Sequence, residues 1–245
     1  THPYLATRPV AYSNLDIIRA VQKAGFPLSK AVVMIGQSQG AAAALSTVAY
    51  APSYAAELDI KGVVATGAPY FTAEAIAVIQ ATRPNDVVDP MLGYNFLALS
   101  MLGLIDDKFK LEDYVSTEVL PVAKAVSDTC YAEMKQLVKK QQVTYIKAFK
   151  KSPAEPLNKA FKRMEYPTLK LNAPAFFGIG GKDINTPPRM QQALVRDACA
   201  AGSKVETHFY RTGTHGSIVN GSTEDSSLFV AAAFAGEELQ GNCLK

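Results

Sequence analysis

Residues 31–40 read AVVMIGQSQG, and the last five of them, Gly36 to Gly40, form a G-x-S-x-G motif. The apolar run 31–35 predicts a buried strand, and the small residues 41–48 that follow predict a helix. A strand, a sharp turn and a helix are the context in which this motif presents a serine as a nucleophile. The pattern therefore predicts a nucleophile elbow with Ser38 at its tip. The alternative is a glycine-rich turn with an incidental serine.

Composition is typical of a globular protein and excludes several other classes. The chain has 245 residues, of which 48% are hydrophobic and 19% charged, and a net charge of +3. This length fits one large domain or a core with an inserted subdomain. The basic runs 139–140 and 147–151 fall in a helical region, which favours a solvated helix face over nucleic-acid binding. No apolar run is long enough to cross a membrane.

Strand and helix patterns alternate outside the middle of the chain. The predicted strands are residues 31–35, 60–66, 173–178 and 204–211; the predicted helices are 13–25, 39–50, 188–201 and 226–240. The first of these helices opens on Ser13 and Asp16, which resemble a capping box, and ends at Gly25. Alternation of this kind predicts the α/β class, with a parallel sheet and helices on its faces.

Residues 87–166 break the alternation and contain helical patterns alone, at 91–105, 111–117 and 122–150. We expect a helical cap inserted over the carboxyl edge of the sheet, so that 1–86 and 167–245 form the core. The apolar run 96–102 either lines an acyl pocket or forms the buried face of a cap helix, and the second is the commoner arrangement.

A serine hydroxyl needs an adjacent base to take its proton, and histidine is the usual one. The chain has three histidines. His2 is terminal, and His208 lies within the fourth predicted strand, where we expect it on one face of the sheet. His215 follows that strand in the loop 213–217. Because the carboxyl ends of parallel strands share one edge, this loop predicts His215 as the base for Ser38.

The acid of such a triad should lie between the serine and the histidine, since this fold uses the chain order Ser, Asp or Glu, His. Asp183 follows the third predicted strand and so reaches the same edge. It would hold the imidazole tautomer and stabilise the imidazolium. Asp86 and Asp89 are competitors, although they follow an earlier helix and begin the insertion. A turn-forming role for Asp183 is the alternative.

With these residues placed, the chain resembles the secretory lipase family (Candida antarctica lipase A-like) of the α/β-hydrolase superfamily. The resemblance rests on residues 1–5 (THPYL), residues 14–20 (NLDIIRA), the elbow, the helical insertion, and separations of 145 from Ser38 to Asp183 and 32 from Asp183 to His215. It implies an α/β-hydrolase fold, a Ser38–His215–Asp183 triad, and a Gln39 backbone N–H as one donor of the oxyanion hole.

The resemblance also interprets the three cysteines. It implies a disulfide between Cys199 and Cys243, and hence an oxidising compartment. Cys130 resembles a cap cysteine that pairs with one upstream of the elbow, but this sequence has none there. Three reduced thiols are the alternative. No C-x-x-C or Cys/His ligand spacing occurs, so we expect neither a metal nor a cofactor.

The resemblance implies about eight strands, of which the sequence contains the later four. A four-strand sheet would expose an apolar edge. The chain starts with neither methionine nor a signal peptide. We therefore expect a preceding N-terminal segment of the same gene product, which also supplies the second oxyanion donor.

The predicted function is that of a secreted or periplasmic carboxylic ester hydrolase, a lipase or esterase acting on hydrophobic small-molecule or lipid esters, with possible contact with a lipid interface. An acyltransferase or a peptidase could use the same triad, because pocket shape and water access decide between them. A noncatalytic hydrolase-like binding protein is the alternative from another class.

Overall fold

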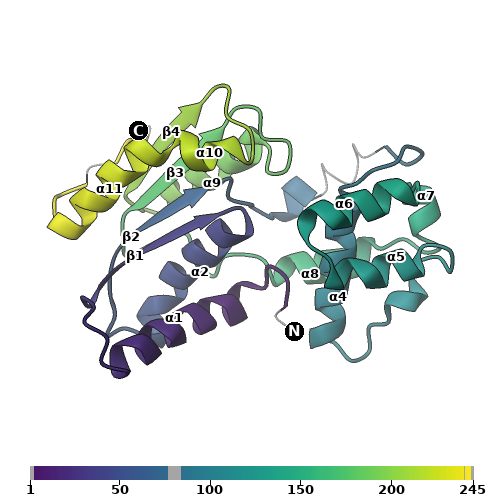
Figure 1. Cartoon of the computed structure of the whole chain (residues 1–245), viewed down its shortest axis with the longest axis horizontal. Helices are drawn as coiled ribbons and strands as arrows, with labels where there is room; N and C mark the ends of the chain where they lie inside the picture. Colours follow the sequence, from purple (N-terminus) through teal and green to yellow (C-terminus); the bar gives the residue numbers. More distant parts are fainter. Residues whose placement is uncertain (1–2, 77–83, 240, 244–245) are drawn as a thin grey trace. The chain divides into compact units, whose positions relative to one another are not determined.

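A computed structural model of the chain describes residues 3–76, 84–239 and 241–243 (Figure 1), so His2 lies outside the described residues. The chain forms two compact units. One, the sheet unit, comprises Thr7–Tyr70 and Glu165–Lys245; the other, the helical unit, comprises Thr1–Ala6 and Phe71–Met164. That residues 87–166 form a cap over the sheet edge stays a prediction.

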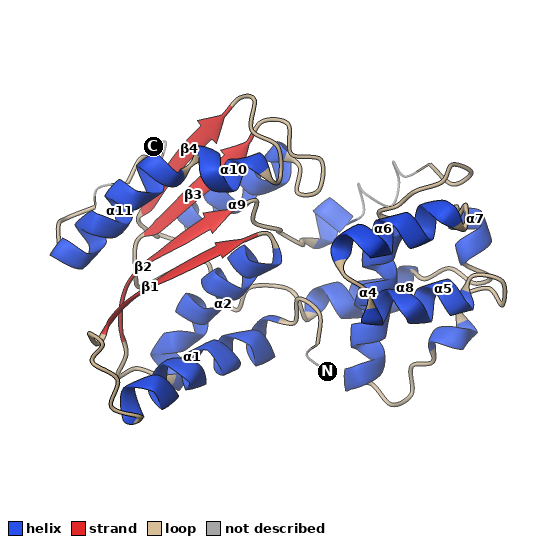
Figure 2. Ribbon diagram, in the orientation of Figure 1, coloured by secondary structure: helices blue, strands red, loops and turns tan. Residues whose placement is uncertain are grey.

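The sheet unit is built on four parallel strands in the order β1-β2-β3-β4 (Figure 2). The strands are β1 (Ala31–Gln37), β2 (Asp59–Thr66), β3 (Ala175–Gly180) and β4 (Val205–Tyr210). All four predicted strands are present, and the predicted α/β class with a parallel sheet is confirmed. β3 begins two residues later than predicted, after Pro174, whose ring nitrogen has no hydrogen to donate to a ladder.

Both faces of the two central strands, β2 and β3, are buried, and successive side chains point to alternate faces. On β2 and β3, Val63 and Phe177 pack with the helices α2 (Gln39–Tyr54) and α9 (Pro188–Ala200). Their neighbours Val64 and Phe176 point the other way and pack against Phe229 of α11 (Thr223–Ala235). The period of two that is intrinsic to a strand thus supplies both cores. The helix α1 (Thr7–Lys23) packs on α2, and α10 (Ser217–Gly221) packs near β3.

The prediction that α1 starts at Ser13 is wrong, because the helix begins six residues earlier, at Thr7. Leu5 has a positive φ of 54°, which marks a turn just before the helix. Pro9 falls in the first helical turn, where its missing N–H costs nothing. Ser13 is therefore an interior residue. The predicted end holds, since the chain leaves the helix at Gly25 with φ 75°.

The bounds of two other helices differ from the prediction. α2 runs four residues beyond residue 50, to Tyr54. α11 runs from Thr223 to Ala235 instead of 226–240, and Gly236 ends it in the left-handed conformation with φ 71°. Glycine favours such a helix end because it has no Cβ to strain the backbone. Gln240 lies outside the described residues.

The helical unit contains α4 (Leu92–Ile105), the 3₁₀ turns η1 (Leu111–Asp113) and η2 (Val126–Asp128), α5 (Leu120–Ala125), α6 (Tyr131–Lys140), α7 (Tyr145–Ala148) and α8 (Ala154–Lys162). The single helix predicted for 122–150 is wrong. Cys130 has extended backbone and its N–H donates to Glu133 at 3.2 Å, which caps a new helix. Gln142 has a φ of 49°, which breaks the chain again before α7.

Residues of α4 lie in the core of the helical unit. Phe96 is fully buried with Val122 and Met134, and its ring centroid lies 5.9 Å from that of Phe149. Leu99 and Met101 are also buried. The apolar run 96–102 is therefore the buried face of a helix, as the commoner of the two interpretations expected.

The outer edge of β4 is covered by a segment near the end of the chain. The N–H of Asn242 donates to the Val205 carbonyl at 2.7 Å. Its side chain accepts from the Thr207 N–H at 2.7 Å and donates to the Thr207 carbonyl at 2.8 Å. A disulfide between Cys199 and Cys243 fixes this segment, with the two Cα atoms 5.7 Å apart. Cys130 is an exposed free thiol.

The opposite edge of the sheet is uncovered in the part of the chain that the structure describes. No described strand pairs with the outer side of β1. The Ile35 side chain on β1 is 67% exposed. Beside this strand lies an apolar groove whose lining includes Ile17 and Val21 of α1, Val33 of β1 and Phe234 of α11. One edge of the sheet is therefore covered by Asn242, whereas the other is uncovered among the described residues.

Candidate active site

Ser38 stands on the turn between β1 and α2. Its backbone has φ 56° and ψ −118°, a conformation that is strained for a residue with a side chain. The Ser38 N–H donates to the carbonyl of Thr66 at the end of β2, at 2.9 Å. A Cβ on Gly36 would lie 2.0 Å from the Gly40 carbonyl oxygen, so the tight turn requires glycine there.

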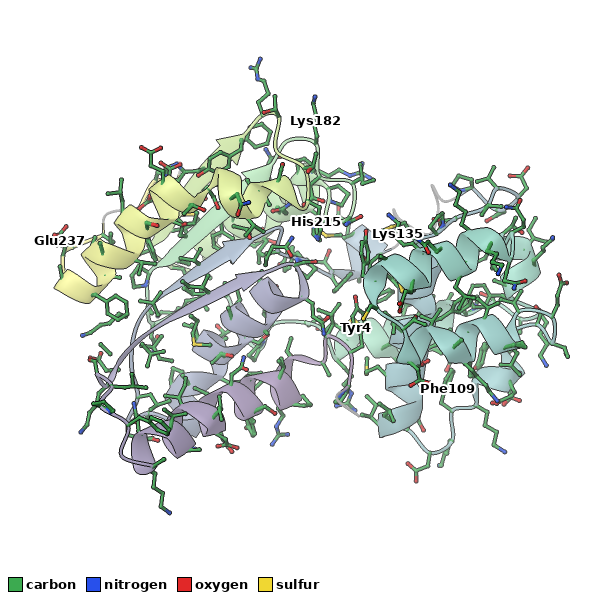
Figure 3. All side chains as sticks on the ribbon, in the orientation of Figure 1. Tyr4, Phe109, Lys135, Lys182, His215 and Glu237 are labelled. Carbon is green, nitrogen blue, oxygen red and sulfur yellow. A yellow bond between two sulfur atoms is a disulfide. The ribbon has the colours of Figure 1, made fainter. Side chains whose placement is uncertain are left out.

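His215 contacts both other members of the predicted triad. Its Nε2 lies 2.8 Å from the Ser38 Oγ, and its Nδ1 lies 2.8 Å from the Asp183 Oδ2. The residue belongs to the loop between β4 and α10, and Figure 3 shows it beside the ends of the strands. The structure thus brings Ser38, His215 and Asp183 into one hydrogen-bonded chain.

Asp183 is a buried carboxylate that its surroundings keep ionised. Its Oδ1 accepts from the N–H groups of Asn185 and Thr186, both at 2.9 Å. Its Oδ2 accepts from the Thr186 hydroxyl at 2.8 Å and from His215. Burial opposes the charge, but the hydrogen bonds from His215 and Thr186 outweigh it and hold the pKa of the Asp183 carboxyl below its ordinary value.

The parallel sheet explains why residues so far apart in sequence meet. β1, β3 and β4 all end at the same edge, and the three predicted triad residues follow those ends. The two later loops are also tied together. The Lys182 N–H donates to the Gly213 carbonyl at 2.8 Å, and the Gly181 N–H donates to the Tyr210 carbonyl at 2.8 Å. These bonds fix the Asp183 loop against the His215 loop.

The competitors for the triad positions have other surroundings. Asp86 and Asp89 belong to the helical unit. Asp86 is exposed, and the Asp89 Oδ1 accepts from the Met91 N–H at 2.8 Å just before α4. His208 lies on the α11 face of the sheet. Its ring stacks on Phe176 at 5.1 Å between centroids, and its Nε2 lies 2.8 Å from the Glu206 Oε1.

The site contains four residues that sequence reasoning missed. The Gln37 Nε2 donates to the His215 carbonyl at 2.9 Å, and the Gln191 Nε2 donates to the Thr186 carbonyl at 2.6 Å and to the Asp183 Oδ2 at 3.2 Å. Thr186 contacts the acid and the base together. Gly67, at the end of β2, packs against the His215 ring. Gln37 and Thr186 stand one and three residues from predicted triad members, which is the signal that could have drawn attention to them.

The N-terminus of α2 carries partial positive charge, which favours negative charge nearby. Gln39 is the first residue of this helix, directly after Ser38, so its N–H has no partner within the helix. The aligned peptide dipoles of α2 add partial positive charge there. The predicted oxyanion donor therefore stands at a helix N-terminus.

Metal and membrane features are absent from the described ranges. Within residues 3–76, 84–239 and 241–243, no three His, Cys, Asp or Glu side chains are grouped to hold a metal ion. Among the helices of these same ranges, none has both the length and the apolar character required to cross a membrane.

The fold of this chain is similar to the folds of a known lipase and a known esterase. The structure is similar to that of Candida antarctica lipase A, with a TM-score of 0.77 at 19% identity over 99% of this chain and 58% of that one. It is also similar to the rice cell wall degrading esterase LipA from Xanthomonas oryzae, with a TM-score of 0.70 at 17% identity over 94% of this chain and 66% of that one. The predicted α/β-hydrolase fold is confirmed.

This chain spans less than two thirds of either structure. No curated protein matches its sequence. A profile of the secretory lipase family, however, matches residues 3–152, which is more than half of the chain. The chain belongs to the secretory lipase family.

Proposed function

We propose that this chain carries the catalytic triad of a serine carboxylic ester hydrolase, a lipase or esterase that acts on hydrophobic esters. The observation that carries the proposal is the pair of 2.8 Å contacts that join Ser38 to His215 and His215 to Asp183. A serine, a base and an orienting acid linked in this way are the requirements for activating a hydroxyl nucleophile.

In the proposed reaction each residue has one role. The Ser38 Oγ attacks the ester carbonyl carbon while its proton passes to the His215 Nε2. The imidazolium then gives this proton to the departing alcohol, which leaves an acyl group on Ser38. Water repeats the sequence and releases the acid. Asp183, ionised throughout, holds the Nδ1 proton and stabilises the imidazolium.

The tetrahedral intermediate needs donors for its oxyanion. In this proposal the Gln39 N–H supplies one, supported by the dipole of α2. A second donor comes from the loop that follows an earlier strand in this superfamily. Loss of one such donor costs about 10²–10³ in rate. A form of the protein that includes this loop should therefore be more active than these 245 residues alone.

The uncovered edge of β1 leads to a second part of the proposal. A preceding segment of the same gene product covers this edge and the apolar groove beside it. Two observations support this: the other edge of the sheet is covered by Asn242, and the related structures are longer than this chain. Intact-mass measurement of the native active protein tests it, and a mass equal to that of this chain alone would refute it.

Secretion is part of the same proposal. The family to which the chain belongs is described as secretory, and the Cys199–Cys243 disulfide is of the kind that persists in oxidising compartments. Contact with a lipid interface, expected of an enzyme for hydrophobic esters, stays a prediction.

A fluorophosphonate probe tests the catalytic assignment directly. It should label Ser38 in the folded chain, and Ser38→Ala and His215→Ala should each abolish labelling. Ser53→Ala, which removes an exposed serine from the other end of α2, is the matched control and should label normally. Absence of labelling both in the isolated chain and in the native protein would reject the enzyme assignment.

A panel of p-nitrophenyl esters from acetate to palmitate then tests the substrate class. Hydrolysis that improves with chain length supports a hydrophobic acyl site. An acyltransferase would instead transfer the acyl group to an added alcohol faster than to water, and a peptidase would cleave amides at a comparable rate.

A further inference from the structure

We propose that Gln37 and Thr186 are positioning residues that clamp His215 from two sides, one through its backbone and one through its ring. This inference rests on the proposed function. It concerns side chains that touch no reacting atom and that act through the base.

Thr186 holds the ring side of the clamp. Its Oγ1 lies 2.8 Å from the Asp183 Oδ2, 3.1 Å from the Gly67 carbonyl and 3.3 Å from the His215 Nδ1. A hydroxyl has one proton and two lone pairs. It can donate to the carboxylate or to the Gly67 carbonyl while its oxygen faces the Nδ1–H of the imidazole. The residue is buried, so these contacts are not shared with bulk solvent.

Gln191 keeps Thr186 and Asp183 in place. This amide is buried, and its Nε2 donates to the Thr186 carbonyl at 2.6 Å and to the Asp183 Oδ2 at 3.2 Å.

Because the ionised Asp183 can accept but not donate, the Nδ1 of neutral His215 must carry the proton. The Nε2 lone pair is then free for the Ser38 hydroxyl.

Gln37 holds the backbone side of the clamp. It is the last residue of β1, and its Nε2 donates to the His215 carbonyl at 2.9 Å. This bond joins the residue before the nucleophile to the residue that deprotonates it. A Cβ on Gly67 would lie 3.1 Å from the His215 ring and 3.3 Å from the Gln37 Nε2. The imidazole therefore packs directly on backbone, with no side chain between.

The clamp has a physical consequence for proton transfer. A general base works only when it stays within hydrogen-bond reach of the proton that it takes. His215 lies in a loop, and the hydrogen bond to Asp183 alone would let the ring rotate about that bond and let the loop backbone move. Thr186 restricts rotation of the ring, and Gln37 restricts movement of the backbone. Loss of either should therefore lower kcat and leave KM little changed.

Thr186→Val tests the ring side, because it replaces a hydroxyl by a methyl group of similar size. We expect kcat to fall about 10- to 100-fold, which corresponds to one lost hydrogen bond and one buried group left unpaired. Thr186→Ser restores the hydroxyl and should recover activity to within about threefold. Thr207→Val is the matched control. The Thr207 Oγ1 on β4 is buried without a hydrogen-bond partner among the described residues, so kcat should not change.

Gln37→Met tests the backbone side with an unbranched side chain that cannot donate. Its kcat should fall about tenfold. Since both residues act on one imidazole, the double variant Gln37→Met/Thr186→Val should lose less than the product of the two single losses. Full multiplicativity, or equal losses in Thr186→Ser and Thr186→Val, would overturn the clamp.

A measurement that needs no turnover separates this inference from the proposed function. The Nδ1 proton of His215 should give a low-field proton resonance in the folded chain, which Asp183→Asn removes and so assigns. Thr186→Val and Gln37→Met should broaden or shift this resonance, whereas Thr186→Ser and Thr207→Val should preserve it. An unchanged resonance in the first two variants would reject the clamp even if the chain hydrolyses no ester.

Discussion

Gly36 and Gly40 flank Ser38 symmetrically in the sequence, but they have different surroundings. A Cβ on Gly36 would meet the Gly40 carbonyl oxygen at 2.0 Å, whereas a Cβ on Gly40 would meet no atom within 4 Å. The first glycine is therefore required by the turn. The second occupies the first turn of α2, where glycine is a poorer helix former than alanine.

We accordingly predict opposite effects for two conservative substitutions. Gly36→Ala should lower the free energy of unfolding by about 3 kcal/mol or more, because the clash is with backbone that cannot move aside. Gly40→Ala should leave it unchanged or raise it by up to about 1 kcal/mol. Urea unfolding of both variants checks this, and equal destabilisation would contradict the distinction.

Asp183 makes stability depend on acidity. Its folded-state pKa is lowered, so it contributes stability above its unfolded pKa of about 3.9, and this contribution is lost as the pH falls through the folded value. The difference in free energy of unfolding between the parent and Asp183→Asn should shrink as the pH falls below about 4. Chemical denaturation at several pH values measures it. A difference that grows on acidification would show that the carboxylate is not stabilised by folding.

Among individual residues, sequence reasoning identified the three candidates for the triad and missed the residues that contact them. Ser38 lies in a motif, and Asp183 and His215 follow strands in a known order, so each could be placed in advance. Gln37 and Thr186 make their contacts with the backbone of residues that follow other strands, His215 after β4 and Gly67 after β2. No local pattern encodes a bond between positions 178 residues apart.

At the scale of elements, prediction succeeded where one pattern decides the structure. The four strands are apolar runs bounded by turns, and their positions were correct to within two residues. The helical unit was harder. The run 122–150 has helical composition throughout, yet Cys130 starts a new helix through a contact with Glu133 and Gln142 takes a positive φ. Neither residue is a typical helix breaker, so residue propensity alone could not locate these two breaks.

The disulfide is an element-scale device with a measurable contribution. It joins Cys199 at the end of α9 to Cys243 beside β4, across a separation of 44 residues. Cys243→Ser should lower the free energy of unfolding by about 3–4 kcal/mol, since the unfolded chain regains the entropy of an open loop. Cys130→Ser removes an exposed free thiol and is the control. Because Cys130 is the N-cap of α6, where serine is favourable, it should raise the free energy of unfolding by about 1 kcal/mol or less. Equal stability of Cys243→Ser and the parent would show that the bond constrains nothing.

For the whole molecule, the open edge of β1 predicts how this chain behaves by itself. Exposed edge strands with apolar side chains pair with other chains. We expect the isolated chain to self-associate and Ile35→Lys to reduce the association without unfolding the protein. Ile146→Lys, on α7 in the helical unit, is the control, because Ile146 is also exposed, at 65%, but lies on no strand. Sedimentation velocity measures the association. If the two lysine substitutions reduce it equally, association depends on exposed apolar side chains in general and not on the edge of β1.

Asn242 has a consequence for the order of events during synthesis. It follows Tyr210, the last residue of β4, by 32 positions. Chains emerge from the ribosome starting at the N-terminus, so all four strands are available before Asn242 can cover the edge of β4. During that interval the outer edge of β4 is open to other nascent chains. Formation of the Cys199–Cys243 disulfide fixes Asn242 over this edge and ends the interval. The supply of oxidant therefore sets how long the edge of β4 stays exposed during folding.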